Sequence, residues 1–266
     1  MKKADIDKIR KYGRRTILET VRSEDEGSDV RYQIVQYTLP VFHGADALAI
    51  EFDNNGSYIY SAVYTNPRRH FQPVYQVAQR LIDAYFAKRG LDSALVLGCA
   101  GCTIPRFLVL HYPHSRVVGV EYSRQFVDIA KRFFMNAQMR ERFELICADG
   151  FEYVRENAQK RRFGLVYTDI YAADMIHPDV YTQEFVSQVY DLLDEGGLAV
   201  INSFRVPIEQ IRGFAQSIGS PFGAVYIIEQ YRKYFIVLAK TRDNAVLERF
   251  ERRLPRYAQI DLRQIR

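Results

Sequence analysis

The chain has 266 residues, 48% hydrophobic and 26% charged, which is ordinary for a globular protein and leaves room for one large domain with a small appendage. Its net charge of +5 is modest and its basic residues are mixed with acidic ones, so we expect no nucleic-acid-binding surface. It has no run of 18 apolar residues, no secretory signal in its charged N-terminus, and too few cysteines for a disulfide framework, so we expect a protein of the reducing cytoplasm with no membrane partner.

Short runs of β-branched and aromatic residues dominate the first quarter of the chain, after a basic leader at residues 1–15. Turn-forming stretches such as DNNG at 53–56 separate these runs, which predicts a small antiparallel β unit. The predicted strands cover residues 17–22, 31–37, 47–52 and 58–64. Apolar residues at helical spacing then predict a helix over 73–88.

From residue 93 onward, short apolar runs alternate with amphipathic stretches. This alternation predicts strands at 94–97, 116–121, 143–147, 163–169, 198–202, 223–229 and 234–239, and helices at 103–111, 124–136, 150–157, 183–193 and 208–217. Four successive βα units predict a parallel sheet with helices on both faces, and the last two strands lack a helix between them.

The predicted fold class is therefore α/β, a doubly wound and mostly parallel seven-stranded Rossmann-like sheet with an antiparallel terminal hairpin. The small β unit precedes it. We expect three parts: a leader and β unit at 1–66, a nucleoside-binding domain at 67–240, and a partly helical C-terminal extension at 241–266. Seven strands with a terminal hairpin is the plan of class I S-adenosylmethionine-dependent transferases, which the chain resembles in this respect.

Ligands of such sheets bind beyond the carboxyl ends of the strands, and three successive strands end in residues suited to a nucleoside. Gly98 and Gly101 form a turn whose backbone can approach a ligand closely. Glu121 ends the next strand, where an acid can accept hydrogen bonds from ribose hydroxyls. Asp149 and Gly150 end the third; the Asp can bind an adenine amino group, cap the following helix, or do both.

The fourth strand of the predicted sheet ends in an acid, Asp169, which is followed closely by Tyr171. A carboxylate here would face the reactive end of a bound nucleoside, where it could orient an amine nucleophile and take its proton. Asp169 and Tyr171 are therefore the candidate catalytic residues, and the structural alternative for the Asp is a loop cap.

The chain resembles the polyamine aminopropyltransferases, the spermidine synthase-like proteins, over about residues 57–239. The matching stretches are 95–108 (LVLGCAGCTIPRFL), 117–121 (VVGVE), 147–150 (CADG), 166–169 (VYTD), and 181–185 (YTQEF) leading to 193–197 (LDEGG). This resemblance implies that the glycines and acids of the first three strand ends hold decarboxylated S-adenosylmethionine, or S-adenosylmethionine itself, as co-substrate. It implies that Asp169 is the base, and that Gln72 lies near the active site and helps to bind the nucleoside. It also implies that a small amine or other small acceptor is alkylated by a homodimer without a metal.

The chain departs from the family pattern at three positions that are usually acidic, which carry Pro73, Ala100 and Ala172. Asp174 lies near the last of them but is two residues away. We therefore expect the nucleoside pocket to be kept and the acceptor pocket to differ. A less charged amine, another acceptor and a loss of catalysis stay open.

Three alternatives accompany this hypothesis. The same fold serves methyltransferases that use intact S-adenosylmethionine. A Cys99-x-x-Cys102 pair at a helix N-terminus is compatible with redox chemistry or, with Cys147 and a histidine, with zinc; His111 and His114 lie at the far end of that helix, which disfavours zinc. A non-catalytic binding or assembly module is the third alternative.

Overall fold

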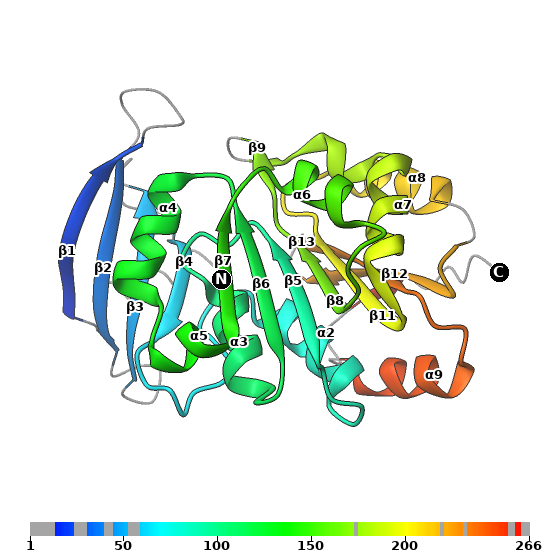
Figure 1. Cartoon of the computed structure of the whole chain (residues 1–266), viewed down its shortest axis with the longest axis horizontal. Helices are drawn as coiled ribbons and strands as arrows, with labels where there is room; N and C mark the ends of the chain where they lie inside the picture. Colours follow the sequence, from blue (N-terminus) through cyan, green and yellow to red (C-terminus); the bar gives the residue numbers. More distant parts are fainter. Residues whose placement is uncertain are drawn as a thin grey trace.

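The computed structural model describes residues 14–23, 31–39, 45–52, 59–172, 175–218, 221–230, 233–254 and 259–261. These residues form two main sheets, which lie next to each other in Figure 1. The N-terminal sheet is antiparallel, and its order follows the chain: β1 (Arg14–Arg22), β2 (Arg31–Leu39), β3 (Ala45–Phe52) and β4 (Ile59–Tyr64). The predicted β unit is confirmed, whereas the predicted leader lies almost entirely outside the described residues.

The second sheet has the strand order β14-β12-β13-β11-β8-β5-β6-β7. Its strands are β5 (Ser93–Leu97), β6 (Arg116–Glu121), β7 (Phe143–Cys147), β8 (Phe163–Thr168), β11 (Leu193–Asn202), β12 (Ala224–Gln230), β13 (Lys233–Ala239) and β14 (Gln259–Asp261). The five neighbouring strands β11, β8, β5, β6 and β7 pair in parallel. Strand β13 pairs antiparallel with β11, and β12 pairs antiparallel with β13. The predicted seven-stranded, doubly wound sheet with its terminal hairpin is confirmed.

Helices cover both faces of this sheet. One face packs against α2 (Gln76–Phe86), α3 (Thr103–His111), α4 (Arg124–Ile129), α5 (Ala137–Arg142) and α9 (Asn244–Arg253). The other packs against α6 (Gly150–Asn157), α7 (Gln183–Leu192) and α8 (Ile208–Ser217). No helix in the described ranges has the length and apolar character that crossing a bilayer requires.

Some predicted bounds shift, most of all for β11, which begins at Leu193 rather than at residue 198. Three segments also differ in the elements they form. The helix predicted over 124–136 is α4 followed by a π-helical turn, η2 (Ala130–Phe134), and α5 begins separately because the side chain of Asn136 caps it. The loop after β8 forms a small hairpin, β9 (Tyr171–Ala172) with β10 (Met175–Ile176), and a 3-10 turn, η3 (Pro178–Tyr181). The C-terminal segment adds an eighth strand, because β14 pairs with β12.

The N-terminal sheet shares its hydrophobic core with the larger sheet. Ile34, Ile50 and Val63 are fully buried in the same cluster as Phe126 and Phe134. Burying this much aliphatic and aromatic surface together fixes the N-terminal sheet against α3 and α4. The sheet therefore forms a wall over the carboxyl ends of β5 and β6.

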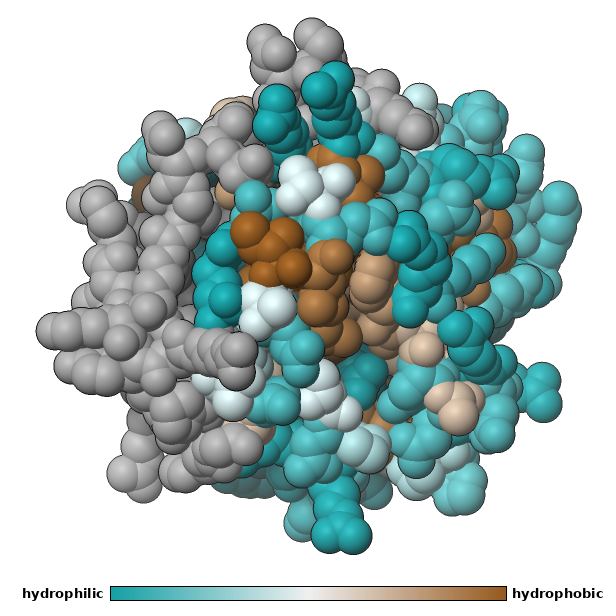
Figure 2. Space-filling model, turned by 90° about the vertical axis from the view of Figure 1, so that its left-hand side faces the viewer, coloured by the Kyte–Doolittle hydropathy of each residue, from teal (hydrophilic) through white to brown (hydrophobic). Residues whose placement is uncertain are grey.

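The far side of the N-terminal sheet carries apolar side chains at its β1 edge, on the face that Figure 2 shows. Ile17 is 46% exposed and Leu18 is 43% exposed, and the pairing with β2 shifts register between Ile17 and Glu19. An exposed edge strand has unpaired backbone N–H and C=O groups that can pair with another chain, and many proteins cover such edges. The homodimer that the family resemblance implies stays a prediction.

Candidate functional site

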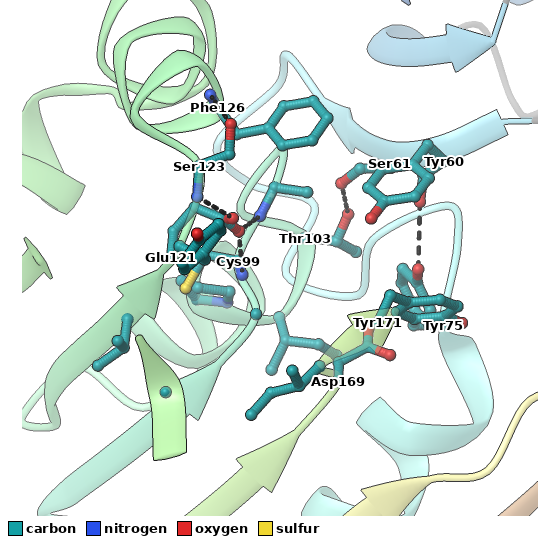
Figure 3. A pocket seen from close by; sticks show the side chains of 18 of the residues that line it. Tyr60, Ser61, Tyr75, Cys99, Thr103, Glu121, Ser123, Phe126, Asp169 and Tyr171 are labelled. Atoms are coloured by element: carbon teal, nitrogen blue, oxygen red, sulfur yellow. Dashed lines mark hydrogen bonds between the residues drawn. The ribbon is translucent and has the colours of Figure 1, made fainter. Parts of the chain in front are cut away.

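A cavity of about 260 Å³ opens beyond the carboxyl ends of β5, β6 and β8 (Figure 3). Strand order reverses at β5, since β6 lies on one side of it and β8 on the other, and this is the position where open α/β sheets bind ligands. Among the described residues that line it, two are acidic, Glu121 and Asp169, and none is Lys, Arg or His. Six are aromatic: Tyr32, Tyr60, Tyr75, Tyr122, Phe126 and Tyr171.

The turn after β5 brings the backbone against the end of β8. Gly98 has φ +82°, and a Cβ at this position would collide with the carbonyl oxygen of Asp169. Gly101 makes room differently, because a Cβ there would lie 2.7 Å from the Oγ atom of Ser61 in the N-terminal sheet. Gly98 lines the cavity, whereas Gly101 is not among the lining residues and instead permits close packing of the two sheets.

Backbone strain is concentrated around this cavity. Among the described non-glycine residues at positive φ are Tyr75 at 57°, Ala100 at 38° and Cys102 at 57°. Tyr75 and Ala100 line the cavity, and Cys102 adjoins it in the same turn. Conformations of this kind cost free energy and cluster at functional sites, so they support assigning a function to this cavity.

Glu121 holds the turn through backbone hydrogen bonds. Its Oε2 atom accepts from the amides of Cys99 at 2.9 Å and Ala100 at 2.8 Å, and its Oε1 atom accepts from Ser123 at 3.1 Å. A carboxylate offers about four acceptor positions, so roughly one stays available to a ligand. Glu121 thus clamps the glycine turn and keeps limited capacity for a ribose hydroxyl.

Asp169 follows β8 directly, and its Oδ1 atom accepts a hydrogen bond from Nδ2 of Asn202 at 2.7 Å. Burial raises the pKa of Asp169 to about 7, and the charge of Glu121 adds to this, while the Asn202 hydrogen bond and the charge of Lys233 oppose it. A carboxylate with a pKa near neutrality is suited to general-base chemistry. Tyr171, the second predicted catalytic residue, lines the same cavity, with its ring 6.2 Å from that of Tyr60.

Asp149 caps helix α6, as one of the two interpretations of the sequence predicted. Its Oδ1 atom accepts from the amides of Phe151 at 2.8 Å and Glu152 at 2.9 Å. Asp149 is not among the cavity-lining residues, but the adjacent Gly150 is. A Cβ at Gly150 would lie 2.8 Å from the Cδ1 atom of Ile170, so the absence of a side chain there keeps this side of the cavity open.

Gln72 has a structural position. It is fully buried; its Oε1 atom accepts from the amide of Tyr64 at 3.0 Å, and its Nε2 atom donates to the carbonyl oxygens of Arg69 at 2.8 Å and His70 at 2.7 Å. The side-chain amide is thus committed to the segment between β4 and α2. Gln72 is not among the cavity-lining residues, so its geometry does not support the predicted contact with the nucleoside.

The two cysteines of the turn do not support redox chemistry. Both are buried and free, and burial raises the pKa of each thiol, so neither is held as a thiolate. The described part of the chain brings together no group of three or more His, Cys, Asp or Glu side chains that could hold a metal ion. Cys99 and Cys102 instead pack as small apolar residues of the core.

Several residues of the site were not found from the sequence. The N-terminal sheet contributes Tyr32, Tyr60 and Ser61, and no pattern in the sequence indicated that this sheet would cover the cavity. Tyr75 enters from the segment before α2. Asn202 could have been found, because it ends β11 and the strand-end argument applies to it as well.

A family model and a curated relative both relate this chain to enzymes that make polyamines. The family model for the spermine/spermidine synthase domain matches residues 84–244. A polyamine aminopropyltransferase of Thermoplasma volcanium is 32% identical over 133 residues, which span 49% of this chain and 48% of that protein. An eEF1A lysine and N-terminal methyltransferase of Mus musculus is 26% identical over 116 residues, 41% of this chain and 16% of that protein.

Among solved structures, a probable spermidine synthase from Corynebacterium glutamicum superposes with a TM-score of 0.63. The superposition covers 91% of each chain at 18% sequence identity. At this identity the likeness shows the fold, and it includes the N-terminal sheet as well as the larger sheet.

Proposed function

The chain belongs to the spermine/spermidine synthase domain family, and on that premise we propose that it transfers an aminopropyl group from decarboxylated S-adenosylmethionine to a small amine. The observation that carries the proposal is Asp169: a carboxylate with a pKa raised to about 7 by burial, in the cavity at the sheet's switch point. The glycine turn and Glu121 at the strand ends would fit any nucleoside-binding protein of this fold. Asp169 next to them, a carboxylate with a pKa near 7, supports proton abstraction from an amine.

The charge of the cavity favours the decarboxylated donor over intact S-adenosylmethionine. The intact molecule carries a carboxylate, and the described residues that line the cavity include no Lys, Arg or His to pair with it; the charge of Lys233 reaches Asp169, but Lys233 is not among these lining residues. The decarboxylated molecule carries only positive charges on its tail, which two carboxylates and six aromatic side chains suit. The residues present therefore fit the group that the family implies.

The nucleoside part of the donor would lie against Glu121 and the Gly98 turn. The remaining acceptor position of Glu121 suits one ribose hydroxyl, and a flat base would pack beside Gly150 and Ile170, which both line the cavity. Asp149 could bind an adenine amino group through Oδ2, because both amide hydrogen bonds of its cap use Oδ1. Its capping and binding roles are thus compatible.

Asp169 and Asn202 would carry the transfer step. The sulfonium donor supplies an electrophilic carbon, to which the amine nitrogen bonds while the C–S bond breaks and its electron pair stays on sulfur. The Asp169 carboxylate takes the proton that the nitrogen releases. Asn202 holds Oδ1 of that carboxylate at 2.7 Å, which leaves Oδ2 for the amine.

Calorimetric titration with decarboxylated S-adenosylmethionine, intact S-adenosylmethionine and methylthioadenosine tests this proposal. We expect the decarboxylated donor and methylthioadenosine to bind more tightly than the intact molecule. Preference for intact S-adenosylmethionine would replace the proposal with methyl transfer. Binding of none of the three would leave only the fold.

Ala100 offers a way to strengthen the donor site by design. It lines the cavity with φ 38°, a conformation that Asp and Asn tolerate better than most residues. The substitution Ala100→Asp places a carboxylate where it can face the primary ammonium of the donor, so we expect about tenfold tighter binding of decarboxylated S-adenosylmethionine. Ala100→Asn is the matched uncharged control, and equal effects of the two substitutions in calorimetry would refute the charge argument.

Methyl transfer is the second candidate function, and the similarity to the mouse methyltransferase favours it. Because that match spans 16% of the mouse protein, it supports the shared nucleoside-binding part rather than the acceptor. A role in polyamine biosynthesis, a homodimeric state and a cytoplasmic location stay predictions from the sequence.

A further inference from the structure

A lysine lies beyond Asp169, on the side of the sheet away from Glu121. In the strand order, β8 has β5 and β6 on one side and β11 and β13 on the other. Asp169 follows β8, Glu121 ends β6, and Lys233 is the first residue of β13. Because β13 runs antiparallel to β11, Lys233 lies at the edge of the sheet where β8 and β11 end. This is the edge that carries the cavity.

The loop after β11 fixes the position of Lys233 relative to Asp169. Asn202 ends β11 and donates to Oδ1 of Asp169 at 2.7 Å. The amide of the next residue, Ser203, donates to the carbonyl oxygen of Tyr234 at 2.8 Å. Since Tyr234 directly follows Lys233, a short series of contacts connects the candidate base to the start of β13.

Two cationic side chains meet over one aromatic ring at this place. Nζ of Lys233 lies 4.9 Å from the centroid of the Phe204 ring, and Cζ of Arg205 lies 5.3 Å from the same centroid. Arg205 has a φ of 64°, a left-handed conformation that costs free energy and is concentrated at functional sites. Two neighbouring positive charges repel each other, and an anionic ligand would offset that repulsion. The cluster of Lys233, Phe204 and Arg205 therefore suits an acidic group.

The charge of Lys233 also reaches the candidate base. Burial raises the pKa of Asp169 to about 7, and the positive charge of Lys233 opposes this. Burial lowers the pKa of Lys233, and the negative charge of Asp169 opposes that in turn. The ammonium is thus close enough to the carboxylate for the two charges to interact, which agrees with the strand order.

The direction of attack places the acceptor on the Lys233 side of the site. An amine attacks the donor carbon from the side opposite the departing sulfur, with the reacting atoms aligned. In the proposed function the nucleoside, and with it the sulfur, lies toward Glu121 and Gly98, so the amine approaches from the side of β11 and β13. Lys233 is partly exposed and is not among the residues that line the cavity, so it would contact the far end of the acceptor rather than the attacking nitrogen.

From these positions we propose that the acceptor is an amino acid in which several carbons separate the amine from a carboxylate, and that the carboxylate pairs with Lys233 while the nitrogen faces Asp169. The inference rests on the proposed function and names the acceptor class for the same site. The nitrogen bonds to the aminopropyl carbon, the C–S bond breaks with its electron pair on sulfur, and Asp169 takes the proton. The products are an N-aminopropyl amino acid and methylthioadenosine.

Matched pairs of acceptors measure what the carboxylate contributes. With decarboxylated S-adenosylmethionine saturating, kcat/KM is measured from the release of methylthioadenosine. The pairs are 4-aminobutanoate with n-butylamine and 6-aminohexanoate with n-hexylamine, so that two spans are covered. We expect the acid to exceed its alkylamine about tenfold in at least one pair, because a charge-assisted contact with Lys233 is gained.

The outcomes separate this inference from the proposed function. A ratio near one or below in both pairs would overturn the inference while the donor site stands. So would release of methylthioadenosine with none of the four amines by a protein that binds the donor in calorimetry. A protein that does not bind the donor would overturn the proposed function, and this inference with it.

Variants of Lys233 test its part in the preference. Lys233→Met keeps an apolar chain and removes the charge, whereas Lys233→Arg keeps the charge. Because loss of the charge also alters the base Asp169 for every acceptor alike, the readout is the ratio of kcat/KM between acid and alkylamine. We expect this ratio to fall to about one in Lys233→Met and to persist in Lys233→Arg. It should also persist in the control Lys160→Met, which removes an exposed lysine after α6.

Three results with these variants would contradict the inference. An unchanged ratio in Lys233→Met would show that the lysine does not select the acceptor. An equal loss in both Lys233 variants would assign the effect to packing rather than charge. Weaker calorimetric binding of intact S-adenosylmethionine to Lys233→Met than to the parent protein would assign Lys233 to the carboxylate of that donor.

Discussion

Replacement of Asp169 by Asn is expected to lower kcat for aminopropyl transfer by about 10²- to 10⁴-fold, the range that a positioned general base contributes. Asn has the same shape, and its side-chain oxygen can still accept the hydrogen bond from Asn202, so the local structure should persist. Methylthioadenosine should bind the variant about as well as the parent protein, because the base acts on the acceptor. Single-turnover rates and calorimetry measure the two effects separately.

The matched control is Asp128→Asn, which makes the same change on the exposed face of α4 and should leave kcat unaltered. An Asp169→Asn variant with full activity would assign this carboxylate a structural role. It would then favour the non-catalytic alternative.

The pH dependence of activity should originate from the same carboxylate. Burial raises the pKa of Asp169 to about 7, so the fraction of ionised base, and with it kcat, should fall as the pH drops below about 7. The free energy of unfolding should have the opposite pH trend, because the folded state binds the Asp169 proton more tightly than the unfolded state does. The stabilising contribution of Asp169 is therefore fully present below the unfolded pKa near 3.8, and it is lost as the pH rises to about 7. Denaturant unfolding of the parent and of Asp169→Asn between pH 5 and 8 checks this sign.

Most of the fold could be predicted because its signals are local. Helices α3, α6 and α8 and strands β6 and β7 have the predicted bounds, since apolar periodicity and turn residues mark their ends. Helix α5 was missed because its six residues are too few to show helical periodicity, and the predicted helix over 124–136 ended before it. Strand β14 was missed because a three-residue strand at an edge has no pattern of its own and forms through pairing with β12.

The candidate site could be predicted only where the strand-end rule applies. It located Glu121, Asp169 and Gly98, which the structure brings to one cavity. It could not find the tyrosines of the N-terminal sheet, because their position depends on how two sheets pack. Gln72 shows the reverse error: a position suggested by family resemblance is occupied by a side chain whose hydrogen bonds are all used by neighbouring backbone.

Replacement of Glu121 by Gln is expected to affect both ligand binding and stability. The Glu carboxylate accepts three amide hydrogen bonds, and a Gln in the same place must turn its NH₂ group toward at least one of those donors. Leaving a buried donor unsatisfied costs about 1–3 kcal/mol, so the free energy of unfolding should fall by about that amount. Methylthioadenosine affinity should fall by about 100-fold, because the glycine turn and the ribose acceptor are lost together.

The control is Glu144→Gln, which makes the same substitution at an exposed position on the neighbouring strand β7 and should change neither quantity. The two measurements on Glu121→Gln separate the roles that the geometry combines. A loss of stability with unchanged affinity would mean that Glu121 only clamps the turn, and the ribose contact would be wrong. A loss of affinity with unchanged stability would mean that the turn keeps its shape without the clamp, and that Glu121 acts on the nucleoside directly.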